Sequence, residues 1–71
     1  MGYIESGAIK VVEIIGVSAK SWEDAAKMAV AKAAESLEGI TGVEAVSFTA
    51  RVKDGKIVSH TTTCKIAFAV K

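Results

Sequence analysis

Cysteine and histidine, two residue types that often carry chemistry, each occur once in this chain. Cys64 and His60 lie four positions apart on a segment with the composition of a strand, so their side chains would share one face about 13 Å apart. That separation is too long for a direct bond. We interpret Cys64 as a small buried hydrophobic residue. His60 is interpreted as a solvated or interfacial strand residue, and the alternative is metal or ligand contact across a symmetry axis.

The sequence carries none of the common catalytic motifs. It has no glycine-rich phosphate loop, no cysteine or histidine pair at zinc spacing and no nucleophile elbow. No pair of side chains therefore suggests acid–base or nucleophilic catalysis. The sequence predicts a protein that is not an enzyme and has no catalytic residues.

Three other features each have a structural and a functional interpretation. The run Thr61-Thr62-Thr63 suits the pleated surface of a strand, but the hydroxyls of Thr61 and Thr63 would share a face and could line a polar pocket. Glu44 is a single carboxylate, which a ring of symmetry-related copies could use to hold calcium or magnesium. Trp22 could stack on a ligand, although its helical spacing from later alanines favours a packing role.

Length and composition define the class of protein. The chain has 71 residues, 51% of them hydrophobic, which predicts one domain over residues 1–71. The net charge of +1 provides no field to attract nucleic acid or an anionic membrane, so neither is an expected partner. A single cysteine favours a reducing compartment. The sequence shows neither a signal peptide nor an apolar run of membrane-spanning length, and we expect a soluble, cytoplasmic protein.

The elements that would position these residues begin with a strand and a helix. Residues 8–17 are rich in β-branched side chains. Apolar residues stand at both odd and even positions, which predicts a strand buried on both faces. Lys10 and Glu13 interrupt opposite faces, where they either meet neighbouring subunits or lie in water. Ser21 begins a helix, and Asp24 completes a capping box. Apolar residues recur at helical spacing and place this helix on a sheet; they are Trp22, Ala26, Ala29, Val30, Ala33 and Leu37.

Two further strands follow the helix, whose end is marked by Gly39 and Gly42. Residues 43–53 alternate, which predicts a half-buried strand. One face has Val46, Phe48, Ala50 and Val52, and the other has Val43, Ala45, Ser47, Thr49, Arg51 and Lys53. Asp54-Gly55 predicts a tight hairpin turn, and residues 56–70 form the third strand. One face of that strand has Cys64, Ile66, Phe68 and Val70, and the other has Ser59, Thr61, Thr63, Lys65, Ala67 and Ala69.

The resulting fold class is α+β, a β-α-β-β subunit in which a three-stranded antiparallel sheet wraps around one amphipathic helix. One helix covers only one face of the sheet. The other face is partly apolar, and the long strands leave free hydrogen-bonding edges. We expect identical subunits to associate with closed symmetry, because association would cover the apolar face and the free strand edges.

These elements resemble the dodecin family over residues 9–70. The resemblance rests on residues 13–18 (EIIGVS) leading into 21–26 (SWEDAA), and on 43–46 (VEAV), 54–57 (DGKI) and 65–68 (KIAF). It implies a hollow homododecamer that binds and stores a small ligand, in many members a flavin such as riboflavin or FMN stacked in pairs near two-fold axes. The site residues it implies here are Gly42, Val43, Glu44, Ala45, Thr61 and Thr63.

The flavin site implied by the resemblance is altered in this chain. Flavin-binding members carry a tryptophan two residues before the glutamate that matches Glu44, and here that position is Gly42. A glutamine that bonds the polar edge of the flavin corresponds to Thr61, whose hydroxyl cannot make the same two-point contact. The alternatives are therefore a flavin-free shell that binds calcium or magnesium, with Glu44 as a ligand, or one that binds a nucleotide-like cofactor such as coenzyme A.

Overall fold

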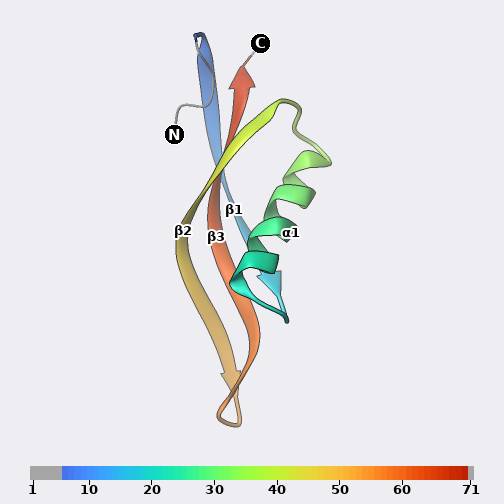
Figure 1. The fold of residues 1–71 in the computed structure, drawn as a ribbon, viewed down its shortest axis with the longest axis vertical. Helices are drawn as coiled ribbons and strands as arrows, with labels where there is room; N and C mark the ends of the chain where they lie inside the picture. The colour runs from blue at the N-terminus through green and yellow to red at the C-terminus, as the bar shows by residue number, and fades with distance from the viewer. Residues whose placement is uncertain (1–5, 71) are drawn as a thin grey trace.

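A computed structural model describes residues 6–70 and confirms the β-α-β-β order (Figure 1). The elements are β1 (Ala8–Ser18), α1 (Trp22–Ala34), β2 (Ile40–Lys53) and β3 (Lys56–Val70). All strand pairs are antiparallel, and β3 lies in the centre of the sheet, in the order β1-β3-β2. In Figure 1 the helix lies along one side of the strongly twisted strands, and the β2–β3 hairpin extends past the start of the helix.

The core lies between α1 and the face of β1 and β3 that packs on it. Its buried cluster is Ala29, Ala33, Cys64 and Ile66, with Val12 and Ile14 of β1 packed against it. The fully buried positions of the helix, Ala25, Ala29 and Ala33, are all alanines. Because alanine side chains are short, the helix lies close to the strands, and the large side chain that is fully buried between them, Ile66, comes from β3.

The turns follow the predicted chemistry, except at Gly42. Asp54 and Gly55 have φ angles of 53° and 76°, as the tight hairpin requires. Gly39, with φ of 74°, lies between α1 and β2. The prediction that Gly42 marks the end of the helix is wrong, because β2 already begins at Ile40 and Gly42 pairs with Ala67 within the sheet.

The face of the sheet turned away from α1, here called the outer face, is open in the single chain. Val11, Ile15 and Val17 of β1 are 42%, 58% and 56% exposed, so only one face of β1 is covered within the subunit. Burial of its second face, which the sequence predicts, requires a partner and stays a prediction. The helix covers only the opposite face, which carries Val12 and Ile14. The uncovered apolar side chains on the outer face create the need for a partner.

Strand β2 is not half-buried as its alternation predicted. Phe48 and Val52 are 59% and 65% exposed, because α1 packs mainly on β1 and β3. The predicted sharing of one face by Ala45 and Ser47 is also wrong. Ala45 lies opposite Cys64, Ser47 lies opposite Thr63, and an irregularity between them changes the register. One extra residue in a strand reverses the faces of all residues that follow it.

No helix within residues 6–70 is long and apolar enough to cross a membrane.

Candidate functional site

The structure divides the predicted site residues between the two faces of the sheet. Gly42 and Glu44 lie opposite Ala67 and Lys65, on the outer face with Thr61 and Thr63. Val43 and Ala45 are opposite Ile66 and Cys64, whose side chains are buried beneath α1. Four of the six predicted residues are therefore brought to one surface; the side chains of the other two lie on the opposite face.

A row of three charged residues crosses the outer face. Glu13 of β1 and Glu44 of β2 are both Cα partners of Lys65 in β3, one on each side. All three are exposed. Directly opposed side chains of a sheet lie close enough to interact, so the central ammonium group can attract both carboxylates. Lys65 balances one of the two negative charges, and the row retains a net charge of −1.

Four hydroxyl side chains lie next to this charged row. Thr63 is opposite Ser47, and Thr61 is opposite Thr49, so the hydroxyls form a patch across β2 and β3 on the outer face. We call these four residues the hydroxyl surface. Sequence reasoning identified Thr61 and Thr63 but missed Ser47 and Thr49 as members of the site. The sequence shows that Ser47 and Thr49 alternate along one strand. It does not show the strand register that places them opposite Thr63 and Thr61.

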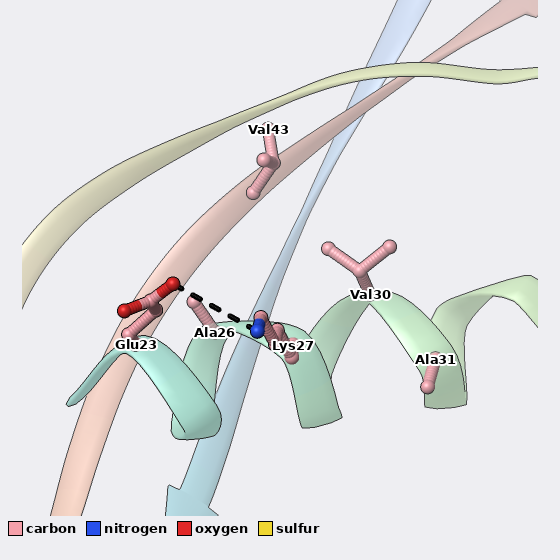
Figure 2. A pocket seen from close by; sticks show the side chains of 6 residues that line it. All are labelled: Glu23, Ala26, Lys27, Val30, Ala31 and Val43. Atoms are coloured by element: carbon pink, nitrogen blue, oxygen red, sulfur yellow. Dashed lines mark ion pairs between the residues drawn. The ribbon is translucent and has the colours of Figure 1, made fainter. Parts of the chain in front are cut away.

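A second feature is an open groove between α1 and β2, with a volume of about 370 Å³ (Figure 2). Apolar side chains make up most of its lining, among them Ala26, Val30 and Val43. In Figure 2, Val43 points from β2 toward the helix, with Glu23 at one end of the groove and Lys27 midway along it. Lys27 Nζ lies 3.8 Å from Glu23 Oε1, and both side chains are exposed. A surface ion pair of this kind contributes little to stability.

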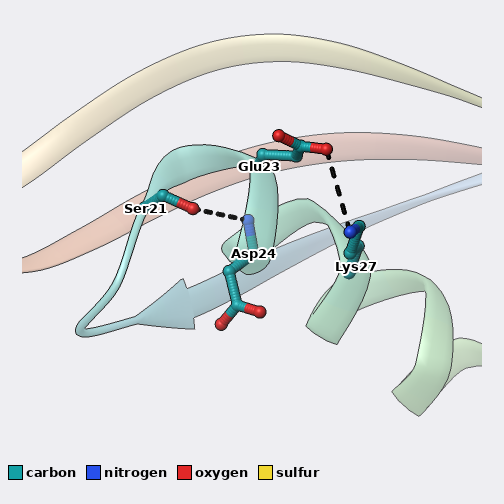
Figure 3. Close-up of polar contacts among 4 residues, drawn as sticks. All are labelled: Ser21, Glu23, Asp24 and Lys27. Carbon is teal, nitrogen blue, oxygen red and sulfur yellow. Dashed lines mark hydrogen bonds and ion pairs between the residues drawn. The ribbon is translucent and has the colours of Figure 1, made fainter.

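The first turn of α1 is fixed by hydrogen bonds from short polar side chains. Ser21 accepts from the Asp24 amide at 3.0 Å, as the capping box predicts (Figure 3). The Asp24 carboxylate does not return to Ser21 but points away from it (Figure 3), and accepts from the Ser18 hydroxyl at 2.6 Å. The cap therefore ties the helix to the end of β1 as well.

Trp22 and His60 meet at the same corner. Their rings are edge to face, with centroids 4.7 Å apart and planes at 85°. His60 Nδ1 lies 3.2 Å from the Ser18 carbonyl oxygen, and because a carbonyl only accepts, this bond places a hydrogen on Nδ1. His60 is half-buried in the single subunit, with its ring against Trp22, and its interpretation as a solvated or interfacial strand residue stays a prediction.

Cys64 is fully buried beneath the helix, in agreement with its interpretation as a core residue. Burial raises the pKa of its thiol above the ordinary value, because the apolar surroundings disfavour the thiolate. A protonated, inaccessible thiol is a poor nucleophile and a poor metal ligand. Within residues 6–70 no three histidine, cysteine, aspartate or glutamate side chains gather as a metal site.

The sequence profile of the dodecin family matches residues 8–71. The chain belongs to the dodecin family. Among solved structures, calcium dodecin from Mycobacterium tuberculosis, a calcium-chelating antigen with a novel calcium-binding site, is 32% identical. That comparison covers 92% of this chain and 93% of the other, with a TM-score of 0.79.

Two further dodecins are alike in fold at lower identity. Dodecin from Streptomyces coelicolor is 20% identical with a TM-score of 0.90, covering 96% of this chain and 97% of that chain. Dodecin from Streptomyces davaonensis is 23% identical with a TM-score of 0.87, and the comparison covers 90% of this chain and 94% of that chain. At these identities the comparison shows the fold alone. No curated protein matches the chain.

Proposed function

We propose that this dodecin is a cytoplasmic, single-domain protein without enzymatic activity, which assembles as a homododecamer and binds a small ligand on its outer face. The supporting observation is the meeting of Gly42, Glu44, Thr61 and Thr63 on that face, beside exposed apolar side chains that a single subunit leaves uncovered. A neighbouring subunit covers these apolar side chains and encloses the ligand. Val43 and Ala45 contribute backbone rather than side chains to the site.

The first candidate ligand is a flavin, riboflavin or FMN, bound with weaker stacking than in family members with a tryptophan at the Gly42 position. The hydroxyls of Thr61 and Thr63, extended by Ser47 and Thr49, offer hydrogen bonds to a polar ligand edge or a sugar-like chain. Glycine offers no ring for stacking, so affinity depends on these polar contacts. The same surface would suit a nucleotide-like cofactor such as coenzyme A.

Flavin binding is tested by titrating riboflavin and FMN with the protein and following flavin fluorescence. We expect quenching at micromolar protein, which saturates at a fixed ratio of ligand to chain. Unchanged fluorescence for both compounds would remove the flavin candidate. Coenzyme A is added in a parallel calorimetric titration, which detects binding without a chromophore.

The second candidate ligand is calcium or magnesium. It is favoured by the 32% identity to calcium dodecin and by the exposed Glu44 in a row that retains net negative charge. Calcium in proteins takes six to eight oxygen ligands. One Glu44 carboxylate cannot supply that number, so the cation would lie where symmetry-related copies of Glu44 meet.

Ion binding is tested by calorimetry with calcium and with magnesium on the wild type and on Glu44→Gln. Glu38→Gln removes the same charge from an exposed position outside β2 and serves as the matched control. We expect the Glu44 variant to lose calcium binding and the Glu38 variant to retain it. Equal loss in both variants would indicate attraction by net charge rather than a site.

A further inference from the structure

We infer that Trp22 is a positioning residue for the hydroxyl surface, because its indole fixes the register of β2 from the opposite side of the sheet. The inference rests on the proposed function, in which the hydroxyl surface binds the ligand. It gives a structural role in the ligand site to the one tryptophan of the chain, which lies on the helix and does not reach the outer face.

Two hydrogen bonds connect Trp22 to both strands that carry the hydroxyl surface. The indole Nε1–H donates to the backbone carbonyl of Thr49 in β2 at 2.8 Å. The backbone carbonyl of Trp22 accepts from the Thr62 hydroxyl of β3, also at 2.8 Å. Thr62 is fully buried, so this second bond is protected from water. One residue in the first turn of α1 therefore holds β2 and β3 in a fixed relation.

Strand β2 needs such a contact because its pairing is irregular on both sides of Thr49. The register to β3 shifts between Ala45 and Ser47 and again between Arg51 and Val52. Thr49 is the middle residue of the regular stretch 47–51 between these two shifts. A slip of one residue in this stretch would bring Phe48 to the outer face and turn Ser47 and Thr49 away from it. The indole bond to Thr49 opposes that slip.

The indole is itself held in place by His60. The edge-to-face contact between the two rings restricts the orientation of the indole, and the His60 Nδ1–H bond to the Ser18 carbonyl restricts the imidazole. Ser18 also bonds Asp24 in the first turn of the helix. The orientation of the Trp22 N–H is thus determined by contacts with both β1 and β3.

The test compares the wild type with two variants, one that removes the indole hydrogen bond to β2 and one that removes a hydroxyl of the hydroxyl surface. Trp22→Phe keeps an aromatic ring but removes the N–H donor, and all four hydroxyls remain. Thr49→Val removes one hydroxyl but keeps the backbone carbonyl that accepts from Trp22. Amide hydrogen exchange is measured by mass spectrometry on each protein, and riboflavin is titrated into each under the same conditions.

In Trp22→Phe we expect the amides of residues 47–51 to exchange about three- to tenfold faster than in the wild type, the change that follows from losing one hydrogen bond. Exchange within residues 62–67 should remain unchanged. Thr49→Val should show wild-type exchange in both segments. Riboflavin affinity should fall by a similar factor in Trp22→Phe although no hydroxyl has been removed.

Two outcomes would overturn the inference. One is wild-type exchange at residues 47–51 in Trp22→Phe; the other is faster exchange throughout the chain, which would indicate a general structural role. If the wild type does not bind riboflavin, that ligand fails, but the exchange data still decide the role of Trp22. If Trp22→Phe does not fold, the wild-type indole N–H decides, since its exchange by NMR should be slower than that of a free indole.

Discussion

The backbone of β1 at Gly16 lies directly against the backbone of Ala25 in the helix. A Cβ atom at Gly16 would overlap the Ala25 carbonyl oxygen and would lie 2.8 Å from its carbonyl carbon and 3.1 Å from Ala29 Cβ. Both residues are buried. Because the obstacle is mainly backbone, no side-chain rotation can relieve it, and the absence of a side chain at Gly16 determines how closely the helix approaches the sheet.

We therefore expect Gly16→Ala to destabilise the fold by about 3 kcal/mol, the upper range for overpacking a core. Gly55→Ala is the matched control. It has no neighbour within 4 Å and loses only the conformational freedom required by a φ of 76°, which costs about 1 kcal/mol. Urea unfolding at fixed protein concentration, followed by circular dichroism, measures both variants. Equal losses would show that the helix can move away from β1 at little cost.

A tryptophan at position 42 should strengthen flavin binding. Gly42 pairs with Ala67 on the outer face, and an indole there would offer a stacking surface that glycine lacks. Gly42→Trp should tighten the Kd for riboflavin about tenfold, since aromatic stacking contributes about 0.5–1.5 kcal/mol beyond burial. Fluorescence titration measures the change, with Gly42→Ala as the control for loss of glycine. Equal affinity in the two variants would remove Gly42 from the ligand site.

The buried Cys64 should make stability fall in alkaline solution. Burial raises the pKa of the thiol above its ordinary value of 9.0, so the folded chain keeps a proton that the unfolded chain releases. The contribution of this group is therefore complete below about pH 9 and is lost as the pH rises toward the folded-state pKa. Urea unfolding of wild type and Cys64→Ala from about pH 8 to 10 measures the difference. Parallel pH profiles for the two proteins would contradict the expectation.

Local sequence signals predicted the elements and their order. Asp54-Gly55 adopts the positive φ angles that its composition requires, and the Ser21 hydroxyl bonds the Asp24 amide. The third strand has the predicted bounds, and Cys64 and Ile66 share its buried face. These features depend on neighbours in the sequence or on simple alternation, so they could be inferred without the fold.

Other features depend on contacts between distant residues. The shift between Ala45 and Ser47 interrupts the alternation of β2, and nothing in the residue types marks it. The bond between Trp22 and Thr49 joins residues 27 positions apart, and it depends on how the hairpin curves past the helix. For the same reason the alignment of Glu13, Lys65 and Glu44 in one row followed only from the strand order β1-β3-β2.

Assembly is the central claim of the proposed function, in which another subunit covers the outer-face side chains Val11, Ile15 and Val17 that are exposed in the single chain. The most direct measurement is the mass in solution by sedimentation equilibrium over a range of micromolar concentrations. We predict a single species close to twelve times the chain mass of 7.4 kDa, unchanged on dilution. A stable, folded monomer of 7.4 kDa would contradict the account.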